Sequence, residues 1–120
     1  MFDAHTHIHF PAYDKDREEV IKRAKKAGVK MITVGTNYQT SKEAVEISER
    51  YPNDIWATVG FHPAHTYSQY HDKKELRKPG REDFNLDKFK TLAKNKKVVA
   101  IGECGLDYYR IEGDKPKILE

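Results

Sequence analysis

The stretch Val98-Val99-Ala100-Ile101-Gly102-Glu103-Cys104-Gly105-Leu106-Asp107-Tyr108 determines how the rest of the chain is interpreted. It begins with a short, uninterrupted apolar run, which is typical of a strand buried on both faces. The run ends at Gly102, and two carboxylates, Glu103 and Asp107, follow within a few residues. An apolar strand that passes directly into acids and glycines is typical of a barrel strand opening into an active-site loop. We therefore expect an active site at the carboxyl end of this strand.

A second strand-like segment with candidate ligands opens the chain. Met1-Phe2-Asp3-Ala4-His5-Thr6-His7 carries two histidines two residues apart, so both side chains point to one face with Cα atoms about 6.6 Å apart. This spacing suits two imidazoles that bind one cation. If the first and last strands are parallel neighbours, Glu103 meets these histidines at one metal ion. The alternative for Glu103, a carboxylate that is costly to bury alone, is a salt bridge to a lysine or arginine.

Four further histidines lie outside this pair. His62, in Gly60-Phe61-His62-Pro63, is expected at the mouth of the third strand, where it either binds a phosphate or leaving group or packs in the loop. His9 is expected in the loop after the first strand, outside the ligand set. His65 and His71 fall in a polar segment, and we expect both at the surface.

Composition and charge indicate a soluble protein of modest core. The 120 residues are 38% hydrophobic with a net charge of +3, and no apolar run approaches the ~18 residues of a membrane span. No secretory signal is visible at the amino terminus. Cys104 is the single cysteine, which excludes an internal disulfide and favours a reducing cytoplasm. We expect Cys104 to be a small buried side chain rather than a nucleophile.

The pattern of elements alternates between strand and helix. Strands are predicted at Phe2–Thr6, at 30–36, at 55–60 and from Val98, and helices at 14–27, at 41–51 with Ser41 as the cap, and at 86–95. Gly28 follows the first helix where a left-handed residue is expected. This β-α-β-α-β-α-β order predicts a parallel α/β sheet with right-handed crossovers. A flavodoxin-like open sheet and a barrel fit the alternation equally well.

Length limits how much of a barrel is present. A complete (β/α)8 barrel needs about 250 residues, whereas these 120 residues supply four strands. We expect residues 1–120 to be a single partial domain, the N-terminal half of a TIM barrel with about four βα units. A half barrel exposes two parallel sheet edges, so a missing C-terminal half or self-association is expected to cover them.

A long polar segment, about residues 64–85, interrupts the alternation after the third strand. It is rich in cations and also contains two tyrosines (Lys73, Lys74, Arg77, Lys78, Arg81, Tyr67 and Tyr70). Loops after barrel strands lie on the active-site side, so these residues are suited to contact a phosphate backbone while a tyrosine stacks on a base. The alternative is a solvated loop in which Glu75, Glu82 and Asp83 offset much of the charge.

Three motifs together resemble the TatD family of metal-dependent DNases: 2–7 (Phe-Asp-Ala-His-Thr-His), 59–63 (Val-Gly-Phe-His-Pro) and 102–108 (Gly-Glu-Cys-Gly-Leu-Asp-Tyr). The resemblance implies a TIM barrel with a two-metal site that hydrolyses phosphodiesters, typically as a 3′-to-5′ exonuclease on DNA. It also implies that His5 and His7 hold one metal, that Glu103 bridges two divalent ions, and that His62 and Asp107 act in catalysis beside the substrate.

The resemblance also shows what these residues lack. Family members take two further histidines and an aspartate from later strands, so we expect this chain alone to hold at most one metal ion and to be inactive or nearly so. Zn, Mn and Mg all remain possible, because His/carboxylate sites admit each of them to some degree. Two alternative functions stay open: another hydrolase of the amidohydrolase or PHP phosphoesterase type, and a non-catalytic fragment that binds nucleic acid.

Overall fold

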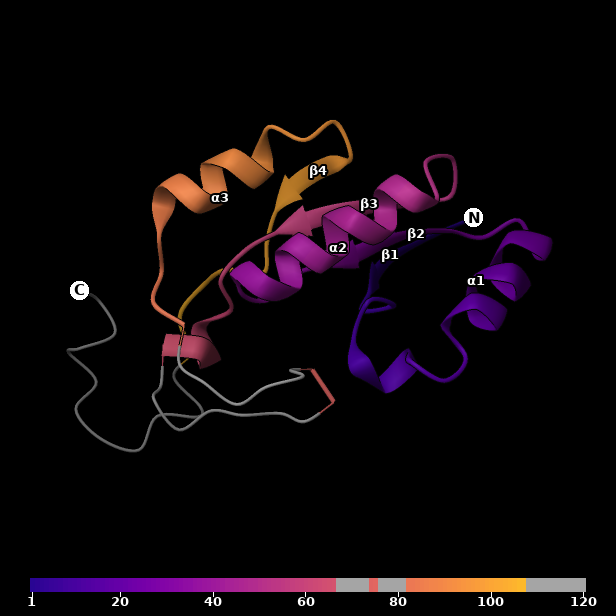
Figure 1. Cartoon of the computed structure of the whole chain (residues 1–120), viewed down its shortest axis with the longest axis horizontal. Coiled ribbons are helices and arrows are strands. Elements are labelled where there is room, and N and C mark those ends of the chain that lie inside the picture. Colours follow the sequence, from indigo (N-terminus) through magenta and orange to yellow (C-terminus); the bar gives the residue numbers. More distant parts are fainter. Residues whose placement is uncertain (67–73, 76–81, 108–120) are drawn as a thin grey trace.

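A computed structural model describes residues 1–66, 74–75 and 82–107, and the structural statements that follow concern these residues (Figure 1). Most of the predicted basic loop lies outside them, including Tyr67, Tyr70 and His71, and so does Tyr108. Within the described part, no helix is long and apolar enough to cross a membrane.

Four parallel strands form one sheet in the order of the sequence: β1 (Phe2–Thr6), β2 (Lys30–Val34), β3 (Ile55–Val59) and β4 (Val98–Ile101). Each strand pairs with the next, with Asp3 opposite Met31, Thr33 opposite Ala57, and Val59 opposite Ile101. The predicted parallel sheet is confirmed. A flavodoxin-like sheet reverses its strand order at a switch point. The uninterrupted order β1-β2-β3-β4 of the described strands excludes that alternative.

Two helices, α2 (Tyr38–Arg50) and α3 (Leu86–Ala93), pack against one face of the sheet (Figure 1). A third, α1 (Arg17–Lys26), joins the same core through Ile21. Alternate residues of β3 point toward them, because side chains along a strand alternate between its two faces. Ile55 joins a core cluster with Ile21 of α1 and Ile47 of α2. Ala57 and Val59 join a second cluster, which includes Ala44, Val45 and Phe89.

Local hydrogen bonds determine the residues at which α1 and α2 begin. α1 begins at Arg17 rather than 14, because a 3₁₀ turn, η1 (Pro11–Tyr13), precedes it and the Arg17 guanidinium binds the Asp14 carboxylate at 2.7 Å. Gly28, just beyond α1, has φ +68° as expected for a helix terminus. α2 begins at Tyr38, and its cap is Asn37, whose side chain accepts the Thr40 N–H at 2.8 Å.

The prediction that Ser41 caps α2 is therefore wrong. Ser41 lies fully buried inside the helix, and its hydroxyl oxygen accepts the Gly60 N–H at 3.1 Å. The same hydroxyl lies 3.3 Å from the Gly60 carbonyl oxygen. A polar residue that looked like a helix start instead links α2 to the end of β3.

The prediction that the Val98 strand is buried on both faces is also wrong. Val99 is 50% exposed and Ile101 is 65% exposed, because β4 pairs only with β3 among the described strands and lies at the sheet edge. Phe2 on the opposite edge strand, β1, is similarly exposed. Cys104, expected to be buried, is exposed beyond the end of β4. The apolar run therefore marks a surface that this part of the chain leaves uncovered.

Candidate metal centre

Three predicted ligands converge at the carboxyl ends of the strands. One ligand atom from each of His5, His7 and Glu103 lies within 4.8 Å of the other two. The condition named for this meeting, that the two strands are neighbours, is not fulfilled, since β1 and β4 form opposite edges of the described sheet. In a flat sheet they would be about 14 Å apart, three strand spacings. Instead His5 Nε2 lies 2.8 Å from Glu103 Oε1, so the sheet curls enough to bring its two edges within reach of these side chains.

The hydrogen bond of His7 determines which of its nitrogens is available. His7 Nδ1 lies 2.8 Å from the backbone oxygen of Val34. A carbonyl oxygen only accepts, so Nδ1 must carry the proton and donate. The neutral ring then keeps a lone pair on Nε2, which is the form that binds a metal ion.

His5 and Glu103 form the exposed side of the cluster. The His5 ring lies edge-on to the His7 ring, with centroids 5.1 Å apart, and its Nε2 contacts the Glu103 carboxylate. The Glu103 side chain is about one-quarter exposed, so the contact is open to solvent. A proton on His5 Nε2 would have to leave before that atom bound a cation, because metal ligands must be deprotonated.

Close backbone packing places Glu103 at this position. The Gly102 N–H donates to the Val59 carbonyl at 3.0 Å, and the Glu103 N–H donates to the Gly35 carbonyl at 3.3 Å, which holds the chain over the end of β2. Gly60 makes this approach possible. A Cβ on Gly60 would lie 2.3 Å from the carbonyl carbon of Gly102, far inside van der Waals contact.

His62 presents a different chemical group to the same region. It lies in the turn after β3, and its Nδ1 accepts the Ala64 N–H at 3.1 Å. The proton of the neutral ring is therefore on Nε2, which faces Glu103 Oε2 at 3.8 Å, beyond hydrogen-bond distance. His7 offers a lone pair, whereas His62 offers a donor.

Asp107 lies at the end of the described loop after β4 and is half-buried. Among the described residues it is not a member of the cluster of mutually close ligand atoms. The structure thus groups three of the predicted site residues, places His62 beside them, and leaves Asp107 outside.

The prediction that His65 lies at the surface is wrong, whereas His9 lies in the loop after β1 and outside the cluster of three ligands, as predicted. His65, expected at the surface, is 7% exposed and binds the buried Glu75. Although it lies in a loop, His9 is 3% exposed, and its Nδ1 lies 2.7 Å from the Thr33 hydroxyl. Burial, followed by the charges of His7 and Arg17, lowers the pKa of His9 to about 3, so this ring is neutral near pH 7. The burial of these two side chains was not predictable from their polar neighbours in the sequence, because it depends on partners in other segments, Thr33 and Glu75.

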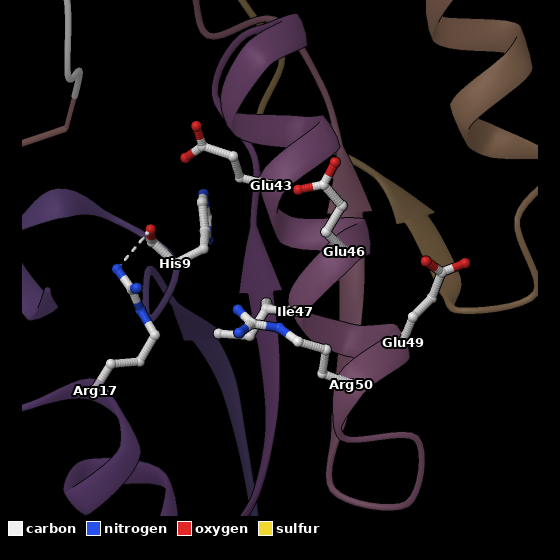
Figure 2. A pocket seen from close by; sticks show the side chains of 7 residues that line it. All are labelled: His9, Arg17, Glu43, Glu46, Ile47, Glu49 and Arg50. Carbon is white, nitrogen blue, oxygen red and sulfur yellow. Dashed lines mark hydrogen bonds between the residues drawn. The ribbon is translucent and has the colours of Figure 1, made fainter.

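A separate cavity of about 580 Å³ lies between the loop after β1 and α2 (Figure 2). Three carboxylates along α2 and two guanidinium groups dominate its lining, which consists of His9, Arg17, Glu43, Glu46, Ile47, Glu49 and Arg50. The dashed line in Figure 2 marks the bond from Arg17 to the His9 carbonyl. None of the three converging ligands lines this cavity, so it is distinct from the candidate metal centre.

Comparison with known proteins assigns the chain that carries this site to a family. A family model described as TatD related DNase matches residues 2–119. The chain belongs to the TatD-related DNase family. The resemblance inferred from the three motifs is confirmed, and the TatD family is metal-dependent in general.

Relatives of known activity and structure support the same TatD assignment. The chain is 40% identical over 111 residues to the 3′-5′ ssDNA/RNA exonuclease TatD of Pectobacterium carotovorum, and 41% identical to that of Salmonella typhimurium. These matches cover 92% of this chain and 38% of each relative. The crystal structure of YJJV, a TatD homolog from Escherichia coli K12, superposes with a TM-score of 0.70 at 29% identity. That match covers 99% of this chain and 41% of the homolog, so the four described strands and three α-helices are part of a TIM barrel.

Proposed function

We propose that this chain forms part of the active site of a metal-dependent nuclease that hydrolyses phosphodiester bonds in DNA, from the 3′ end or in single strands. The convergence of His5, His7 and Glu103 within 4.8 Å carries the proposal. The names of the relatives in Pectobacterium and Salmonella, 3′-5′ ssDNA/RNA exonucleases, support the substrate class. RNA is a second substrate that the same names admit.

The residues present fit a divalent metal ion. His5 and His7 would hold one ion, and Glu103 would bridge it to a second ion in a complete site. His7 is already in the tautomer with a free Nε2 lone pair, because Val34 holds its other nitrogen. When bound, divalent ions would supply Lewis acidity and lower the pKa of an attacking water. Zinc, manganese and magnesium each suit imidazole and carboxylate ligands to some degree.

His62 and Asp107 are proposed to act on the substrate. His62 Nε2–H is a hydrogen-bond donor on the edge of the cluster, where it is able to bind a phosphate oxygen and stabilise charge that develops there. Asp107 follows Glu103 by four residues, and we place its carboxylate beside the departing or incoming hydroxyl group. The distance of 3.8 Å from His62 Nε2 to Glu103 Oε2 places that ring beside the candidate metal ligands.

Three ligands are too few for a two-metal site, so we propose that these residues work together with the rest of a barrel. The chain spans 38% of the length of the curated relatives that it matches. Exposed apolar side chains on both edge strands, such as Phe2 and Ile101, favour a covering by further strands or by a second copy. We propose a cytoplasmic location, because the single cysteine, Cys104, is exposed and would remain reduced there.

The proposal is tested by nucleotide release from single-stranded DNA in the presence of Mn, Mg or Zn. Three proteins are compared: this chain, a longer form that completes the barrel, and Glu103→Ala in the longer form. We expect metal-dependent release by the longer form alone, and its loss in Glu103→Ala. Intact DNA with the longer form would refute the nuclease function. Cleavage by the 120 residues alone would refute the proposed incompleteness of the site.

A further inference from the structure

A buried carboxylate is hydrogen-bonded to a histidine behind the turn that carries His62. Glu75 is 6% exposed, and its Oε1 lies 2.8 Å from Nε2 of the buried His65. Burial acts to raise the pKa of Glu75, but hydrogen bonds from His65 and Thr36, with the charges of His65 and His62, outweigh it and lower the pKa. The carboxylate is thus ionised near pH 7, although a buried charge is expensive unless it is paired in this way.

Thr36 connects this carboxylate to His62. The Thr36 hydroxyl donates to Glu75 Oε1, and the Thr36 carbonyl accepts the His62 N–H at 2.7 Å. Thr36 is itself fixed, because its N–H donates to the Thr40 hydroxyl at 2.9 Å at the capped start of α2. One buried residue therefore holds both ends of the turn: His62 directly, and His65 through Glu75.

The turn between these attachment points determines where the His62 ring points. The His65 N–H donates to the His62 carbonyl at 2.9 Å, and the Ala64 N–H donates to His62 Nδ1 at 3.1 Å. The second bond depends on the turn keeping its shape, and it selects the tautomer with the proton on Nε2. The rings of His62 and His65 lie edge-on, with centroids 6.4 Å apart.

We propose that Glu75 is a positioning residue for His62: by binding His65 and Thr36 together, it fixes the turn that directs the His62 Nε2–H toward the metal centre. The catalytic consequence rests on the nuclease function proposed above. The effect of Glu75 on the His62 ring does not depend on that function, and a separate experiment measures it.

The chain offers a matched control in Glu82. This carboxylate also binds the start of α2, accepting the Tyr38 N–H at 3.1 Å and the Gln39 N–H at 3.4 Å. Neither of these two bonds involves the turn from His62 to His65, and from that turn the charge of His65 acts on Glu82 at a distance. If Glu75 merely tied its own segment to the helix, removing either carboxylate would have the same effect on His62.

The first experiment measures the tautomer of His62 by ¹⁵N NMR in this chain. We expect the wild type and Glu82→Gln to show a neutral ring with the proton on Nε2, and Glu75→Gln to show a mixture of both tautomers. Thr36→Val, which loses only the hydroxyl and keeps the carbonyl bonded to His62, gives the same mixture and replaces Glu75→Gln if that variant does not fold. A wild-type tautomer in both Glu75→Gln and Thr36→Val overturns the proposal.

The second experiment measures DNA cleavage by the barrel-completing form. Glu75→Gln is expected to lower kcat by about 10- to 100-fold, the effect of a small misplacement of a catalytic group, with KM changed less than about twofold. In a His62→Gln background Glu75→Gln should have no further effect, because the two residues act as one unit. An equal additional loss in that background overturns the proposal. If no form cleaves DNA, the nuclease function fails, and the tautomer comparison still decides the role of Glu75.

Discussion

The ring of His7 donates its Nδ1 proton to the carbonyl oxygen of Val34 across 27 positions of sequence. β2 thereby determines the tautomer of the neutral ring of a side chain that follows β1. The backbone supplies this bond, so no substitution of Val34 removes it as long as the strand keeps its shape. The lone pair on His7 Nε2 is accordingly a property of the sheet itself, which supports the use of this ring as a metal ligand.

Metal affinity should depend on Glu103 more than on carboxylates elsewhere. Glu103→Gln removes one charge and one ligand from the cluster, so we expect the affinity for Mn or Zn, measured by isothermal titration calorimetry, to fall at least about tenfold. Glu46→Gln is the control, since Glu46 is an exposed carboxylate paired with Lys42 at 3.7 Å. Equal affinities for the two variants would contradict the assignment of Glu103.

Ser41 and Ser48 should differ in their contributions to stability although both are fully buried in α2. The Ser41 hydroxyl accepts the Gly60 N–H, whereas the Ser48 hydroxyl donates to Val45 within its own helix. Ser41→Ala leaves a buried backbone donor unpaired, which costs about 1–3 kcal/mol. Urea unfolding should show a larger loss of unfolding free energy for Ser41→Ala than for Ser48→Ala. A larger loss for Ser48→Ala would show that the link to Gly60 is not a major contribution.

Two glycines at the metal centre should respond oppositely to an added methyl group. The Cβ of Gly60→Ala would meet backbone atoms of Gly102 and Glu103 at 2.3–2.5 Å, so the end of β4 must shift. An added Cβ at Gly102 meets nothing within 4 Å. We expect Gly60→Ala to lose stability and metal affinity together, and Gly102→Ala to keep most of both. Thermal unfolding and metal titration of the two variants check this, and a tolerated Gly60→Ala would show that the strands separate easily.

The buried His9 should make stability depend on pH. Its pKa is about 3 when folded, against 6.5 as the ordinary value, so the unfolded chain binds a proton that the folded chain excludes. Stability from this group is present above pH 6.5 and decreases as the pH falls toward 3. Between pH 7 and pH 5 the loss is about 2 kcal/mol, from about 1.4 kcal/mol per pH unit.

The variant His9→Asn isolates this contribution. It keeps a polar group near Thr33 but does not titrate, so its unfolding free energy should vary less between pH 7 and pH 5 than that of the wild type. His5→Gln, which replaces an exposed ring, should retain the wild-type dependence. Glu75 does not affect this comparison. Its pKa is lowered from 4.5 in the folded chain, so the stability that depends on Glu75 is lost only below about pH 4.5, outside the range from pH 7 to pH 5. An unchanged dependence in His9→Asn would mean that His9 is protonated in the folded state.

The strands and the convergence of the candidate metal ligands were predictable because each depends on a short pattern. His-x-His in a strand-like segment, or Gly-Glu directly after an apolar run, indicates a candidate ligand at a strand end without knowledge of its neighbours. By contrast, the roles of Glu75 and Ser41 depend on partners 39 and 19 residues away. Glu75 looked like a charge offsetting a basic loop, and Ser41 looked like a helix cap. Both were misread because local composition does not indicate which polar side chains the fold encloses.

The exposure of β4 shows a further limit of such patterns. The run from Val98 to Ile101 has the composition of a buried strand, yet in the described part of the chain it has a neighbour on one side only. Composition indicates the environment for which a strand is suited. Whether the strand is in fact buried depends on the segments that pack around it, as the exposed Ile101 demonstrates.

Arg17 ties the histidine strand to the first helix. Its guanidinium donates to three successive carbonyl oxygens, those of Ile8, His9 and Phe10, at 2.7–3.0 Å. The chain leaving His7 therefore takes its path from a residue in α1. For protein engineering, β1 is not a portable metal-binding peptide: the smallest segment to graft into another scaffold with this connection intact is Phe2–Lys26, strand, turn and helix together.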